Sequence, residues 1–135
     1  MASGVIPSEG KRVLQRMIWE NYNPTLKLRV FKSNTTPTNA SVYSDFTWAT
    51  FTGSTALTLA RDVTWTITSA TPSVSSYPQQ TFTSSDAVAE TEYGWAITDD
   101  TNALIMVMRF DSALSISSST PSIKITPSIP LTAAA

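Results

Sequence analysis

The chain has no cysteine and no histidine among its 135 residues. The lack of cysteine excludes a disulfide framework, a thiol nucleophile and a zinc site of the cysteine type. The lack of histidine excludes a histidine-based catalytic triad and an imidazole proton shuttle. The glycines are also few, namely Gly4, Gly10, Gly53 and Gly94, and their wide spacing excludes a phosphate-binding glycine loop. We therefore expect a non-enzymatic protein without a cofactor, which is stabilised by packing alone.

Charged residues are scarce as well. They make up 14% of the chain, against roughly 25% in an average soluble protein. Serine and threonine, roughly three residues in ten, supply most of the polarity and are typical of strand surfaces and turns. The net charge of -1 gives no reason to expect nucleic acid or an acidic membrane as a partner. No apolar run approaches the roughly 18 residues of a membrane span, so we expect a soluble protein.

The few charges are unevenly distributed. Residues 1–32 contain six basic and two acidic side chains, a net charge of +4, whereas the remainder contains three basic and eight acidic ones, a net charge of -5. Solvated basic faces of a helix and a strand explain this pattern. The alternative is a contact with another protein that is steered by charge. Because residues 7–9 interrupt the apolar start of the chain, we expect no signal peptide and synthesis in the cytoplasm without export.

The length favours one domain over residues 1–135. We expect an N-terminal arm and helix over residues 1–24, a β-sandwich over residues 25–131 and a tail over residues 132–135. The helix is predicted from Ser8, as its cap after a proline, to a stop at residues 23–24.

Period-two alternation then begins, with Leu26, Leu28 and Val30 on one face of a predicted strand. Residues 103–110 form the most apolar run, which predicts a central strand that is buried on both faces. Residues 69–78 are predicted to form a loop, and prolines near the end of the chain favour edge strands there. Short strands separated by frequent turn signals predict an all-β, jelly-roll-like antiparallel β-sandwich with one short N-terminal helix.

Several segments resemble a family of small virion structural proteins of tailed phages, cyanophages among them. The segments are VIPSEG at 5–10, LKLRVF at 26–31 with NTTP at 34–37, SDF at 44–46 with ATFTG at 49–53, YGWAITD at 93–99 with RFD at 109–111, and IKITP at 123–127. The resemblance implies a jelly-roll-like sandwich that decorates or cements a capsid, often as a trimer. The expected partners are other copies of the chain in a homotrimer and the major capsid protein or another virion protein. The expected location is the virion.

Two groups of polar residues, most of them acidic, are candidate sites. Glu90 and Glu92 lie on one face of a predicted strand, where they suit either a glycosidase acid/base pair or a solvated surface. We favour the surface interpretation and expect both residues to tolerate alanine. Asp99, Asp100 and Asn102 offer oxygen ligands for calcium, but these residue types are also typical of a tight turn. We favour the turn and expect no metal site.

The four tryptophans, Trp19, Trp48, Trp65 and Trp95, raise the main alternative function. A row of exposed rings would bind sugars, as in a carbohydrate-binding or adaptor module of a phage tail or fibre. We favour core filling, because Trp65 and Trp95 are in phase with aliphatic neighbours on their strands, and Tyr93 is expected on the same side as Trp95.

The N-terminal helix is the predicted docking element. Its apolar face would meet a partner while its basic side chains meet acidic groups of that partner. The alternative is that the helix closes an open end of the sandwich. The candidate docking residues are Lys11, Arg12, Val13, Leu14, Arg16, Met17 and Ile18.

Overall fold

The computed structural model describes residues 4–69 and 73–131. The elements are β1 (Gly4–Val5), α1 (Ser8–Trp19), β2 (Leu26–Phe31), the 3-10 helix η1 (Tyr43–Asp45), β3 (Leu57–Leu59), β4 (Thr66–Ile67), β5 (Ser73–Ser76), β6 (Gln80–Thr83), β7 (Glu90–Thr98), β8 (Leu104–Ile116), β9 (Ser122–Ile125) and β10 (Ser128–Leu131). The strand pairs are antiparallel. The predicted all-β antiparallel fold with one short N-terminal helix is therefore confirmed. The predicted tail, residues 132–135, lies outside the described residues.

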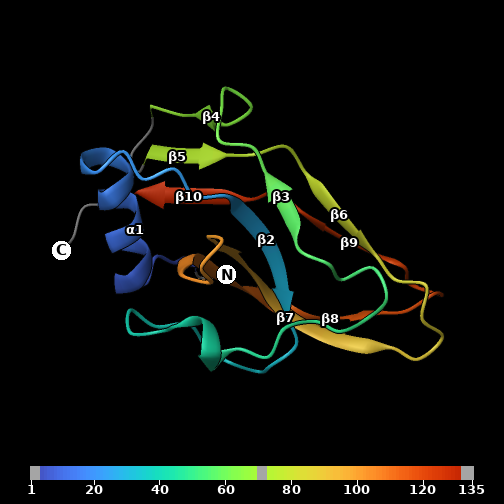
Figure 1. Cartoon of the computed structure of the whole chain (residues 1–135). Helices are drawn as coiled ribbons and strands as arrows, with labels where there is room; N and C mark the ends of the chain where they lie inside the picture. Colours follow the sequence, from blue (N-terminus) through green and yellow to red (C-terminus); the bar gives the residue numbers. More distant parts are fainter. Residues whose placement is uncertain (1–3, 70–72, 132–135) are drawn as a thin grey trace.

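One layer is a five-stranded sheet with the order β1-β8-β7-β2-β3 (Figure 1). The predicted burial on both faces of a sheet is confirmed for the first four residues of β8, which lies between β1 and β7, whereas residues 108–110 of the predicted run are half-buried. Ile105 and Met106 belong to the main core, whereas Leu104 and Val107 belong to a second apolar cluster on the other face. The strand continues to Ile116, so residues 113–116 are its last part.

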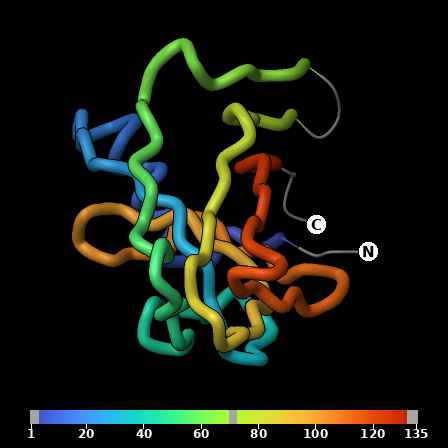
Figure 2. The backbone as a smooth tube through the Cα atoms, turned by 90° about the vertical axis from the view of Figure 1, so that its right-hand side faces the viewer, coloured from blue at the N-terminus to red at the C-terminus, as the bar shows by residue number. Residues whose placement is uncertain are grey.

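The second layer is built from two ladders, β6 with β9 and β10-β5-β4. They follow one another along the chain, and Figure 2 shows the yellow segment beside the red one. At the junction the pairing shifts by one residue, and the Tyr77 amide donates to the Pro127 carbonyl at 2.8 Å. The prediction of a loop over residues 69–78 is wrong for Ser73–Ser76, which form β5. The expected edge position of the last strand is confirmed, since β10 lies at the edge of its ladder and contains Pro130.

The outer face of the five-stranded sheet is covered by the segment that contains η1. Its rings pack on Phe31 of β2, with ring centroids 4.8 Å apart for Phe31 and Phe46 and for Tyr43 and Trp48. Stacked and tilted rings at this separation add to the stabilisation that burial alone gives. Phe31, which alternates with Leu28 and Val30 along β2, is fully buried here.

Helix α1 packs directly on the start of β8. A Cβ atom at Gly10 would collide with the main-chain carbonyls of Leu104 and Ile105, so glycine allows this close approach. The helix begins at Ser8 with Pro7 at the cap position and no side-chain capping bond, so the prediction of Ser8 as the cap is wrong. Within the described residues, no helix has the length and hydrophobicity that crossing a membrane requires.

Candidate functional site

The apolar residues of the predicted docking face divide into two groups. Val13 is buried, and Leu14 and Met17 are half-buried against the main core. Ile18 is 71% exposed, although it follows Leu14 by one helical turn on the same face. The inner part of the face is thus used to cover the sheet, as the lid interpretation expects. Its outer end, Ile18, is openly accessible to a partner.

The basic residues of the predicted docking face are all exposed. Arg16 donates from Nε to Glu20 at 2.8 Å, and its guanidinium lies 4.1 Å from the ring centroid of Tyr22. Because both partners of this ion pair are exposed, it contributes little to stability. Lys11 and Arg12 extend the basic surface along α1. These exposed charges are suited to attracting an acidic partner rather than to stabilising the fold.

Trp19, the last residue of α1, is 83% exposed. The core-filling prediction fails for this ring and holds for Trp95, which is buried, and for Trp65, whose indole N–H donates to the Ala60 carbonyl at 2.7 Å. Trp48 lies in the apolar cluster around Phe31. Sequence reasoning left Trp19 out of the docking set because its position falls outside the apolar stripe of the helix.

An apolar cavity of about 300 Å³ lies between α1 and the strands of the second layer. Leu14 and Met17 line it from the helix, and Ile67 and Ile129 line it from β4 and β10. Ile67 is itself 71% exposed. We call this cavity, together with Ile18 and Trp19, which lie outside its lining at the end of the same helix, the α1 groove. It combines an apolar floor with exposed apolar side chains and a basic helix.

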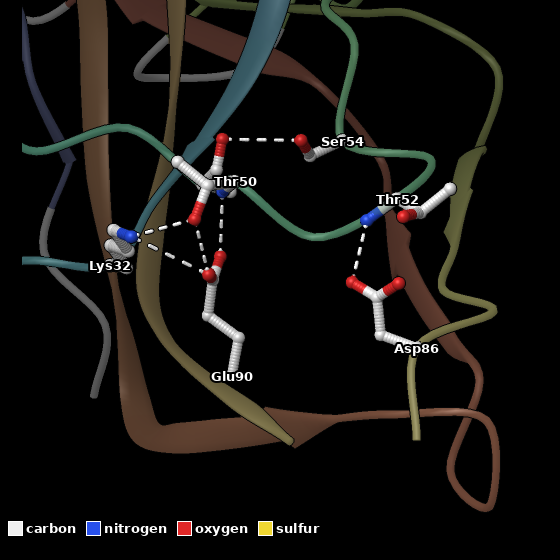
Figure 3. Close-up of polar contacts among 7 residues, drawn as sticks. Lys32, Thr50, Thr52, Ser54, Asp86 and Glu90 are labelled. Atoms are coloured by element: carbon white, nitrogen blue, oxygen red, sulfur yellow. Dashed lines mark hydrogen bonds and ion pairs between the residues drawn. The ribbon is translucent and has the colours of Figure 1, made fainter. Parts of the chain in front are cut away.

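A second candidate lies at the start of β7 (Figure 3). The Glu90 carboxylate accepts the Thr50 amide at 2.8 Å and the Thr50 hydroxyl at 2.7 Å, and the Lys32 ammonium lies 3.5 Å from it. Partial burial alone would raise the pKa of Glu90. Hydrogen bonds from Glu92 and Thr50 and the charge of Lys32 outweigh burial and lower this pKa to about 2.

Glu92 is fully buried, so the prediction that it is a solvated surface charge is wrong. Its carboxyl oxygens have no well-aligned hydrogen bond, and its closest electrostatic partner is the Glu90 carboxylate. Burial raises the pKa of Glu92 to about 8, and the loosely aligned hydrogen bond and the charge of Glu90 act in the same direction. At neutral pH the pair therefore binds one proton: Glu92 is protonated and Glu90 is ionised.

The carboxyl pair does not suit glycoside hydrolysis. Both carboxyl groups of a glycosidase must contact the sugar at the bond that is cleaved, whereas Glu92 has no exposed surface. The oxygens of Glu90 are already occupied by Thr50 and Lys32. The pair is better explained as a structural contact, in which Glu90 binds Thr50 and Glu92 keeps its proton at neutral pH.

The turn after β7 forms as expected. One oxygen of Asp99 accepts the Thr101 amide, the Thr101 hydroxyl and the Ala103 amide at 2.8, 2.8 and 2.9 Å, and the other accepts the Tyr22 hydroxyl at 3.2 Å. These bonds saturate the carboxylate, which favours the turn over a calcium site. Across residues 4–69 and 73–131, no group of three or more acidic, histidine or cysteine side chains is placed to hold a metal ion.

In comparisons with known proteins, no family model matches the chain, and no curated protein matches it significantly.

Proposed function

We propose that the protein is a non-enzymatic structural protein of a phage virion, which decorates or cements the capsid by binding other protein chains. The observation that carries the proposal is the α1 groove with its exposed Ile18 and Trp19. Exposed apolar patches with polar rims are typical of protein-protein contacts, and tryptophan is enriched at their centres. The resemblance to phage virion proteins supplies the class of partner.

In this proposal each part of α1 has its own role. Ile18 and Trp19 supply the apolar contact, and the cavity lined by Leu14 and Met17 accepts an apolar side chain of the partner. Lys11 and Arg12 attract acidic groups of the partner and orient the encounter. The inner residues keep the helix on the sheet, so docking does not require the fold to open.

The proposed partners are the major capsid protein, or another virion protein, at the α1 groove, and other copies of this chain in a homotrimer. A trimer agrees with a domain that has few charges and many hydroxyl groups on its surface. Light scattering at tens of micromolar measures this state. A monomer would contradict the homotrimer and leave the docking proposal to the next experiment.

A sugar-binding or adaptor role in a phage tail or fibre is the second candidate. Its supporting observation is the exposed ring of Trp19. Because the other three tryptophan rings pack inside the protein, a platform of several rings is not assembled on one chain.

Co-sedimentation with phage particles assembled without the protein tests the docking role. We expect a double variant, Ile18→Ser with Trp19→Ser, to bind at least tenfold more weakly than wild type, since it removes both apolar contacts. Val88→Ser is the matched control, because Val88 is 82% exposed and lies near the carboxyl pair. Equal binding of a folded double variant and the wild type would refute the docking role of the α1 groove. Competition by oligosaccharides would favour the second candidate.

A further inference from the structure

Residues 47–54, here called the crossing segment, join the two layers at the end of the sandwich where β7 begins (Figure 3). The Ala49 amide donates to the Val30 carbonyl of β2 at 2.9 Å. Phe51 is buried in the main core. Gly53, with φ of 104°, lies against the Thr83 carbonyl of β6, where a Cβ atom would collide. The crossing segment thus closes this end, with Phe51 as its plug.

Carboxylates hold the crossing segment in place on both sides of Phe51. Glu90 accepts the amide and the hydroxyl of Thr50, and Asp86 accepts the amide of Thr52 at 2.8 Å. Lys32 also donates to the Thr50 hydroxyl at 2.7 Å. The position of the Phe51 plug therefore depends on where the Glu90 carboxylate lies.

Glu92 lies behind Glu90 in the interior. A β-bulge explains its inward direction, because the pairing of β7 with β8 shifts between Glu92 and Gly94. Tyr93 packs with the Phe31 cluster and Trp95 with the main core, although strict alternation would place both rings on one face. The phase of the strand changes at this bulge, and the Glu92 carboxyl is left inside without a well-aligned partner.

We propose that Glu90 and Glu92 form a proton-operated latch on the crossing segment. With a proton on Glu92, the Glu90 carboxylate holds Thr50 and keeps Phe51 in the core. When Glu92 releases this proton to solvent, two carboxylates face one another, and Lys32, the residue after β2, partly offsets their charge. Asp86, which lies before β7, adds a third negative charge near Glu90. Neighbouring like charges repel strongly inside a protein, so Glu90 moves away and the crossing segment opens.

The latch works in the pH range where the buried proton is lost. Burial and the neighbouring Glu90 charge raise the pKa of Glu92 to about 8, so the latch is closed at neutral pH and opens in mildly alkaline solution. It is independent of the α1 groove, because α1 packs at the opposite end of the sheet, on Ile105, while Glu90 begins β7 (Figure 1). The eight residue-to-residue steps from Glu90 to Thr98 span roughly 26 Å at about 3.3 Å each.

Amide hydrogen exchange and carboxyl NMR shifts, measured from pH 5 to 9, test the latch. In the wild type we expect the Glu92 carboxyl to titrate above pH 7. After correction for intrinsic exchange, protection of the Thr50 amide should fall at least tenfold between pH 7 and 9. The Ala103 amide, which is held by Asp99 away from the latch, is the internal reference and should keep its protection.

Two variants separate the roles of the carboxyl groups. Glu92→Gln replaces the protonated acid by a neutral group of the same shape and should keep the Thr50 amide protected at every pH. Glu90→Gln removes the acceptor charge and should lower that protection already at pH 6. A wild-type Glu92 that titrates below pH 6, or a Thr50 amide that follows Ala103 throughout, would overturn the proposal. These wild-type measurements decide the question even if a variant does not fold.

Discussion

The two ends of the sandwich are closed in different ways. At one end α1 lies on β8 through a glycine and an apolar face, and it leaves Ile18 and Trp19 exposed. At the other end, hydrogen bonds to carboxylates fix the crossing segment, and a carboxyl group is buried behind it. Apolar packing does not depend on pH and leaves surface for a partner. At the second end, the buried Glu92 makes the position of the crossing segment depend on whether this carboxyl group is protonated.

The largest effect is expected in the fully buried part of β8, the strand on which α1 packs. Val107→Asp places a charge in a fully buried site and should destabilise the fold by about 4 kcal/mol or more, enough to unfold a marginally stable domain. Circular dichroism with urea unfolding measures this loss. Ser112→Asp, at an exposed position of the same strand, should fold like the wild type. A folded Val107→Asp variant would contradict the strand assignment.

The α1 end should respond to added volume. Gly10→Val forces side-chain atoms against the carbonyls of Leu104 and Ile105 and should cost about 2 to 3 kcal/mol in unfolding free energy through overpacking. Gln15→Val, at an exposed position of the same helix, controls for helix propensity and should cost about 0.5 kcal/mol. If the two variants unfold at the same urea concentration, the close packing of α1 on β8 is refuted.

The carboxyl end should respond to pH, with opposite signs for its two acids. The pKa of Glu92 is raised from 4.5 to about 8, so its contribution to stability falls as the pH rises from about 4.5 to 8 and is level above. The pKa of Glu90 is lowered to about 2, so its contribution is present above about pH 4.5 and is lost as the pH falls toward 2. Together the pair stabilises the fold most near pH 4.5.

Glu92→Gln should remove the alkaline half of this dependence. We expect nearly the same stability as wild type at pH 5 and a gain of about 4 kcal/mol at pH 8, because the variant has no proton to retain and each pKa unit corresponds to about 1.4 kcal/mol. Thermal unfolding followed across this pH range measures both values. A variant that is less stable than wild type at pH 8 would contradict the assignment of the proton to Glu92.

The sequence predicts those parts of the fold in which one face of an element is apolar. In β2, apolar residues alternate regularly, and they face the main core as predicted: Leu26, Leu28 and Val30. Strand β5 was missed because Val74 is its only apolar residue among serines. Main-chain pairing with β10, more than fifty residues later, forms this strand, and such pairing leaves no apolar period in the sequence.

The candidate sites show the same limit. Alternation placed Tyr93 and Trp95 on one face, which is wrong because the bulge after Glu92 changes the phase of the strand. The burial of Glu92 follows from that bulge, and a bulge depends on the partner strand rather than on the residues at the site. At α1, helical periodicity identifies the apolar residues of one helix face, but it does not show which of them are buried against the sheet and which remain exposed.

The central claim, that α1 docks to the virion, is tested most directly by binding to particles that lack the protein as the salt concentration is raised. The triple variant Lys11→Glu, Arg12→Glu and Arg16→Glu is compared with the wild type. We expect wild-type binding to weaken severalfold as the Debye length falls below about 10 Å, and the folded variant to bind at least tenfold more weakly at low salt. Binding that is unchanged by both salt and charge reversal would contradict the claim and leave α1 as a lid on the sheet.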